Sequence, residues 1–139
     1  MRGFFFTLAN RDLFPRLARK GGRAVEIGVF RGDFSQFILE VLEPEELVLV
    51  DQWSLPWSEI NPFPDTPVYL EKLLRDIKEV VGTEDINQGF ADAYPIVCER
   101  FKGEKRIRIV RESSALAARR FEDNSIDYQI GRASCRERV

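Results

Sequence analysis

The stretch VEIGVFRGDFSQ, residues 25–36, constrains the fold most, because its pattern changes from strand to helix across two glycines. Its first part alternates the β-branched residues Val25, Ile27 and Val29, which predicts a short buried strand. The DFSQFILEVL segment that overlaps its end has the apolar spacing of an amphipathic helix. The residues expected on the apolar face are Phe34, Phe37, Ile38, Val41 and Leu42.

The turn between this strand and helix runs from Gly28 to Gly32. Glycine lets the backbone approach a ligand, because no Cβ stands in the way. We expect Asp33 to cap the helix, with Gln36 completing a capping-box-like pattern. The free N–H groups of the helix start point into the turn, where an α/β sheet binds an anionic or dipolar ligand.

Strand and helix patterns alternate along the rest of the chain. Further strands are predicted at Leu47–Val50, within KRIRIVRESS at 105–114, and opening at SIDYQ, residues 125–129. Further helices are predicted at 67–81, capped by Thr66, from about Ala93 to Phe101, and in SALAARRFED at 114–123. The alternation predicts an α/β fold, a Rossmann-like parallel sheet with helices on both faces. Residues 1–22 are expected to form an N-terminal helical segment that ends at two glycines.

Composition narrows the classes of function. The chain has 139 residues, 44% of them hydrophobic, which suffices for one domain with a core. Its formal net charge of −2 does not indicate a nucleic-acid partner, and its apolar start GFFFTLA is too short to span a membrane. Without histidine, and with Cys98 and Cys135 isolated, no metal site is predicted, and the thiols fit a cytoplasmic protein. The oligomeric state stays open.

Two acidic residues indicate which ligand the turn would hold. Glu26 lies in the first strand just before the turn, and Asp51 ends the second strand, where an acid can accept the hydroxyls of a ribose. A dinucleotide-binding turn reads G-x-G-x-x-G, whereas this turn reads G-x-x-x-G after an acid. A carboxylate there repels a diphosphate but suits a ligand with an ammonium group. S-adenosylmethionine combines ribose hydroxyls, an amino-acid head and a positive sulfonium, so it is favoured over a nicotinamide dinucleotide.

The segments VEIGVFRGDFSQFILEVLEPEELVLVDQWS and RIRIVRESSALAARRFEDNSIDY resemble the class I S-adenosylmethionine-dependent methyltransferases. The likeness is to the small-molecule group, with an E-I-G-x-x-x-G first motif and an acid-x-Trp after the second strand. It departs from the more widespread glycine-rich form of that motif. The resemblance implies a cofactor site whose methionine part contacts Glu26, Gly28 and Gly32, whose ribose is bound by Asp51, and whose adenine lies near Trp53, Ser113 and Ser114.

Each of these residues also has a purely structural interpretation. Glu26 could cap a helix or form a salt bridge, Trp53 and Trp57 could simply pack in a loop, and Ser113 and Ser114 are good helix caps. Two other functions share the predicted sheet. One is a nicotinamide-dependent oxidoreductase, and the other is a non-catalytic nucleotide-binding module.

The last ten residues, IGRASCRERV, follow no strand or helix period and resemble the translation of a common sequencing-library adapter. We therefore expect residues 130–139 to be a non-native tail, and residues 23–129 to be an incomplete methyltransferase domain. That domain would hold the N-terminal half only, about four of the seven strands of the family. The family's acceptor-binding half would follow, so no catalytic residue is assigned. We expect the chain by itself to be inactive. The intact protein from which it comes is expected to transfer a methyl group to a small-molecule acceptor.

Overall fold

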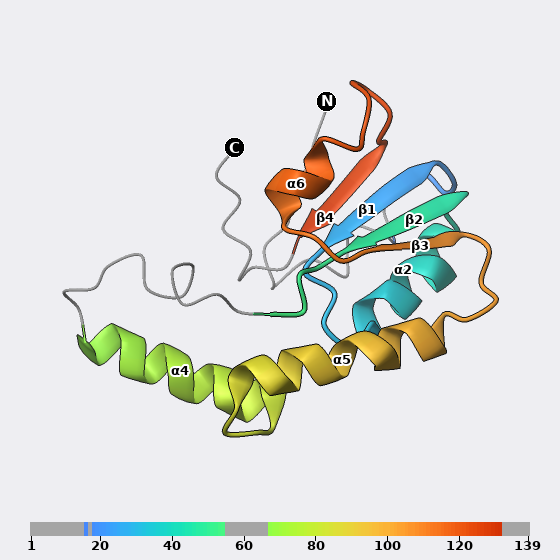
Figure 1. Cartoon of the computed structure of the whole chain (residues 1–139). Helices are drawn as coiled ribbons and strands as arrows, with labels where there is room; N and C mark the ends of the chain where they lie inside the picture. The colour runs from blue at the N-terminus through green and yellow to red at the C-terminus, as the bar shows by residue number, and fades with distance from the viewer. Residues whose placement is uncertain (1–15, 17, 55–66, 132–139) are drawn as a thin grey trace.

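The computed structural model describes residue 16 and residues 18–54 and 67–131. Within them lies one sheet of four parallel strands in the order β3-β2-β1-β4 (Figure 1). The strands are β1 (Arg23–Ile27), β2 (Glu46–Val50), β3 (Ile107–Val110) and β4 (Tyr128–Gly131). The predicted α/β fold with a Rossmann-like parallel sheet is confirmed.

The register of the sheet brings the carboxyl ends of the strands together. Ile27 at the end of β1 pairs with Val50 on one side and Gly131 on the other, and Val50 pairs with Val110. The segments that leave β1, β2 and β3 therefore begin side by side at one edge of the sheet. This carboxyl edge is where open parallel sheets bind ligands.

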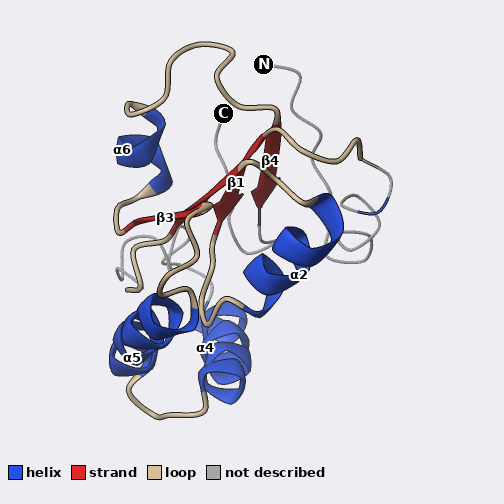
Figure 2. Cartoon of the chain, turned by 90° about the vertical axis from the view of Figure 1, so that its right-hand side faces the viewer, coloured by secondary structure: helices blue, strands red, loops and turns tan. Residues whose placement is uncertain are grey.

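Helices cover both faces of the sheet, as predicted (Figure 2). On one face, α2 (Asp33–Leu42) and α5 (Ile86–Arg100) pack over side chains that include Leu47 and Leu49, and α4 (Pro67–Val81) lies against α5. On the other face, α6 (Ser114–Ala118) covers a smaller cluster around Val48 and Val50. In the part of the chain that the structure describes, no helix is long and apolar enough to cross a membrane.

Helix α2 has the predicted bounds but not the predicted cap. Its N-cap is Gly32, in the left-handed region with φ 83°, and no side-chain hydrogen bond caps the start of the helix. Asp33 is already the first helical residue, and its carboxylate pairs instead with Arg100 of α5, 2.6 Å away. The predicted capping by Asp33 was therefore wrong. The residues that α2 buries are Ser35, Ile38, Leu39 and Leu42, whereas the rings of Phe34 and Phe37 stack on each other, half-buried.

Helix α5 begins at Ile86 rather than at Ala93, because Asp85 caps it by accepting the N–H of Gln88 at 3.0 Å. The part that the sequence did not predict contains Gly89, a residue that usually weakens helices. Gly89 lies where α5 passes α4, and a Cβ there would overlap the side chain of Val81. Pro95 lacks an N–H, yet the helix continues through it.

Strand β4 crosses the boundary that the sequence predicts after residue 129. Ile130 pairs with Glu26 and is 4% exposed in the core beside α2, and Gly131 pairs with Ile27. Ile130 is β-branched and apolar, so it can complete a buried strand even though it falls in the segment that resembles a translated adapter. The predicted leading helix, Thr66, Trp57 and Cys135 lie outside the described residues, apart from residue 16 and residues 18–22 of the leading segment.

Candidate functional site

The turn from Gly28 to Gly32 lies at the carboxyl edge, between β1 and α2. Both glycines have φ 83°, a left-handed conformation that residues with a Cβ rarely adopt, so the G-x-x-x-G spacing follows from the backbone. The N–H of Gly28 donates to the carbonyl of Val50 at 2.9 Å, and the N–H of Gly32 donates to that of Val29 at 3.2 Å. The first bond anchors the turn to the end of β2, and the second closes it.

Asp51 follows β2 and fixes the middle of the turn. One carboxylate oxygen accepts the N–H groups of Val29 and Phe30 at 2.8 and 2.9 Å, and the other accepts the N–H of Trp53 at 2.9 Å. The residue remains partly exposed. Its carboxylate thus takes up two N–H groups of the turn that would otherwise be available to an anionic ligand.

Four of the five N–H groups of the turn are therefore bonded within the chain. Those of Gly28 and Gly32 go to backbone carbonyls, and those of Val29 and Phe30 go to Asp51. Within the turn itself a diphosphate would find few donors, and it would face a negative carboxylate. A cationic ligand, or one that presents hydroxyl groups, meets no such obstacle.

Glu26 is 1% exposed, on the face of the sheet that α2 covers. The hydroxyl of Ser35, in the first turn of α2, donates to one of its carboxylate oxygens. Glu26 thus joins β1 to α2 directly beside the turn from Gly28 to Gly32. Its carboxyl group lies next to the turn, although its side chain has almost no exposed surface.

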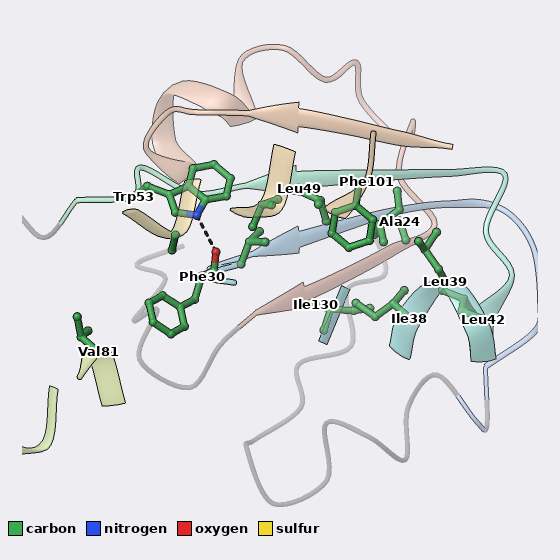
Figure 3. Close-up of a cluster of buried hydrophobic side chains, with 14 residues drawn as sticks. Ala24, Phe30, Ile38, Leu39, Leu42, Leu49, Trp53, Val81, Phe101 and Ile130 are labelled. Atoms are coloured by element: carbon green, nitrogen blue, oxygen red, sulfur yellow. Dashed lines mark hydrogen bonds between the residues drawn. The ribbon is translucent and has the colours of Figure 1, made fainter. Parts of the chain in front are cut away.

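Trp53 belongs to the hydrophobic core (Figure 3). Its side chain is 0% exposed, its indole N–H donates to the carbonyl of Phe30 at 2.8 Å, and its ring lies 5.0 Å from that of Tyr94. The ring therefore fastens the loop after β2 to the turn from Gly28 to Gly32. The predicted contact of Trp53 with adenine would require this ring to leave its present packing.

Ser113 and Ser114 follow β3, one strand further along the carboxyl edge than Asp51. The hydroxyl of Ser113 accepts the N–H of Leu116 at 3.2 Å and caps α6, which the sequence predicted. Ser114 is the exposed first residue of that short helix. Both serines follow β3 at the carboxyl edge of the sheet, and the structure shows a helix-capping role for Ser113.

Arg111, the first residue after β3, is a site residue that the sequence patterns did not single out. Its guanidinium lies over the ring of Tyr94, 4.4 Å from the centroid, and its Nε donates to the carbonyl of Gln52 at 3.4 Å. A hydrogen bond with Cys98 raises the pKa of the Tyr94 hydroxyl above its usual value. In the sequence, only its place directly after a strand could have indicated Arg111. Its partner Tyr94 lies in α5, whose full extent the sequence did not predict.

Phe30 is the second residue that sequence reasoning missed. Its φ is 57°, a left-handed conformation that is rare for a bulky side chain. The signal available was an aromatic residue inside a glycine turn.

No set of three or more acidic, cysteine or histidine side chains in the described ranges is placed to hold a metal ion.

Comparisons with known proteins returned no match: no family model, no curated protein and no solved structure matches the chain. The fold and the geometry of the carboxyl edge are therefore the features from which a function can be inferred.

Proposed function

We propose that this chain binds S-adenosylmethionine at the turn after β1, as the cofactor-binding part of a methyltransferase that acts on a small molecule. The observation that carries the proposal is the bonding of the turn. Four of its five N–H groups are bonded within the chain, and two of these four are held by the carboxylate of Asp51. This supports a ligand with hydroxyls and positive charge over a dinucleotide.

Asp51 would bind the ribose, but with limited capacity. An ionised carboxylate offers about four acceptor positions, and backbone N–H groups already use three of them. The position that remains is on the oxygen that accepts from Trp53. Asp51 would therefore accept one ribose hydroxyl in this conformation rather than both.

The methionine part would lie along the backbone of Gly28 and Gly32, on the side of Gly32 that faces away from the Phe101 ring. The carboxylate of Asp51 would place negative charge beside the turn, and the carboxyl group of Glu26 is buried close by. The charge of Asp51 would attract the ammonium and sulfonium groups, whereas the buried Glu26 would support the turn rather than contact the ligand. Ser113 and Ser114 would border the adenine from the end of β3.

The reaction itself would be an in-line displacement. A lone pair on the acceptor forms a bond to the methyl carbon as the bond from that carbon to sulfur breaks, which leaves a neutral thioether, and the acceptor loses a proton. Such a reaction depends chiefly on alignment and on exclusion of water. No residue described here is assigned a catalytic role.

Calorimetric titration of the chain with S-adenosylmethionine, S-adenosylhomocysteine and NAD tests the proposal. We expect the first two ligands to bind and NAD to show no heat of binding. Asp51→Asn should weaken S-adenosylmethionine about tenfold, since a hydrogen bond to a charged acceptor is worth about 1.5–3 kcal/mol. The matched control is Asp76→Asn, which changes an exposed carboxylate of α4 and should leave the affinity unchanged.

Binding of NAD without binding of S-adenosylmethionine would overturn the proposal in favour of a nicotinamide-dependent enzyme. A folded chain that binds neither ligand would also overturn it. Equal affinities of the Asp51→Asn and Asp76→Asn variants would remove Asp51 from the site.

A further inference from the structure

The turn from Gly28 to Gly32, the proposed ligand turn, contains a residue in an unfavourable conformation that other parts of the chain hold in place. Phe30 has φ 57°, yet it is only 6% exposed, and both of its backbone polar groups are bonded. Its N–H donates to Asp51, and its carbonyl accepts from the indole of Trp53. A strained residue persists only where its surroundings determine its position several times over.

The pair of helices α4 and α5 supplies the other contacts of this turn. The ring of Phe90, on α5, meets the ring of Phe30 edge to face, with centroids 5.5 Å apart. The guanidinium of Arg31 donates to the last carbonyl of α4, that of Val81, at 3.3 Å, and it also lies 4.9 Å from the centre of the Phe30 ring. The middle of the turn is therefore in contact with both helices.

The end of α5 holds the last part of the turn. Arg100 donates from one nitrogen to the carbonyl of Arg31 at 3.3 Å and to the carboxylate of Asp33 at 2.6 Å. Gly32 lies so close to the ring of Phe101 that a Cβ would stand 2.8 Å from the nearest ring carbon. Contacts from α4 and α5 thus reach each residue from Phe30 to Asp33.

We propose that the helix pair α4–α5 is a clamp that holds the ligand turn in its binding conformation, with Phe90 as a positioning residue that acts through Phe30. Neither helix supplies a residue of the proposed ligand contacts, so the clamp affects binding only through the turn. The statement about ligand affinity depends on the proposed function. The statement about the conformation of the turn does not.

Hydrogen exchange of the ligand-free chain, followed by mass spectrometry, tests the clamp directly. In Phe90→Ala, the peptide that covers residues 28–33 should exchange at least about fivefold faster, since an edge-to-face aromatic pair is worth about that factor. Exchange in β2 and β3 should not change. That local response separates positioning from a general loss of stability, which would accelerate exchange throughout the sheet.

The matched control is Ile96→Ala, which truncates a 48% exposed apolar side chain on the same helix. It should leave exchange in the turn unchanged. If Phe90→Ala does not fold, Arg100→Ala gives the same test, because it removes a partly exposed ion pair with Asp33 and a hydrogen bond to the carbonyl of Arg31. Its control is Lys78→Ala, which removes the exposed ion pair with Glu84 at the end of α4.

Titration with S-adenosylmethionine supplies the second measurement. Phe90→Ala should bind it about fivefold more weakly than the wild type, whereas Ile96→Ala should bind it equally well. If the wild type does not bind S-adenosylmethionine, the proposed function fails, and the exchange result still decides the clamp. Unchanged exchange in residues 28–33 of a folded Phe90→Ala or Arg100→Ala variant would overturn the clamp, as would acceleration spread evenly over the sheet.

Discussion

Replacing Asp51 should destabilise the fold through the backbone groups that its carboxylate holds. The carboxylate accepts the N–H groups of Val29, Phe30 and Trp53 at 2.8, 2.9 and 2.9 Å. A hydrogen bond to a charged group contributes about 1.5–3 kcal/mol, and the partial exposure of Asp51 reduces this to about 1 kcal/mol for each bond. We therefore expect Asp51→Ala to lower the free energy of unfolding by about 3 kcal/mol.

Asp51→Asn gives a graded comparison at the same position. The amide oxygen can still accept from Val29 and Phe30, but the NH₂ group then faces the N–H of Trp53 and the negative charge is lost. Two weaker bonds remain out of three stronger ones. The expected loss is about 1–2 kcal/mol, between those of the wild type and the alanine variant.

Equilibrium unfolding in urea, followed by far-UV circular dichroism, measures these free energies. Asp76→Ala is the control, since it removes an exposed carboxylate from α4 and should change the stability by no more than about 0.5 kcal/mol. If Asp51→Ala lost no more stability than Asp76→Ala, the turn would not depend on the carboxylate. The reasoning that assigns the turn to a ligand other than a phosphate would then be refuted.

Two further predictions concern a glycine pair and an ion pair. Gly32 and Gly103 both have φ 83°, but of the two only Gly32 is crowded, because it faces Phe101. Replacement by alanine should lower the free energy of unfolding by about 1–2 kcal/mol at Gly103 and by about 1–3 kcal/mol more at Gly32. Equal losses in urea unfolding would contradict this prediction. Arg106 lowers the pKa of Glu104 to about 2, so this pair stabilises the fold above about pH 4.5 and loses its effect as the pH falls towards 2. Thermal midpoints of Glu104→Gln should therefore fall less than those of the wild type over that range, and parallel curves would contradict this.

The parallel sheet could be predicted from the sequence because its signals are local. Each strand contains β-branched or other apolar residues that pack in the core, and the helices between the strands show their own spacing, so the order of patterns was enough for the fold class. The first half of α5 could not be predicted in the same way. Gly89 usually weakens a helix, and only the passage of Val81 close to Gly89 shows why a glycine is needed there.

The candidate site was predictable in position but not in bonding. The glycine turn and Asp51 lie at the same edge of the sheet, as their places after two neighbouring strands imply. The sequence does not tell that the Asp51 carboxylate points at the backbone of Val29, because that contact joins residues far apart in the chain. The burial of Trp53 depends in the same way on Tyr94, in a helix whose position no local pattern predicts.

The bonding of the turn also shows why its spacing, and not Asp51 alone, opposes a phosphate ligand. Gly28 and Gly32 donate to the backbone carbonyls of Val50 and Val29, so these two N–H groups would stay occupied in any Asp51 variant. A pyrophosphate-binding turn requires a glycine that brings free N–H groups to the ligand. Here the three residues between the glycines instead carry Phe30 towards Trp53 and the helix pair. The same spacing that withholds donors from a phosphate thus creates the strained position that the clamp must hold.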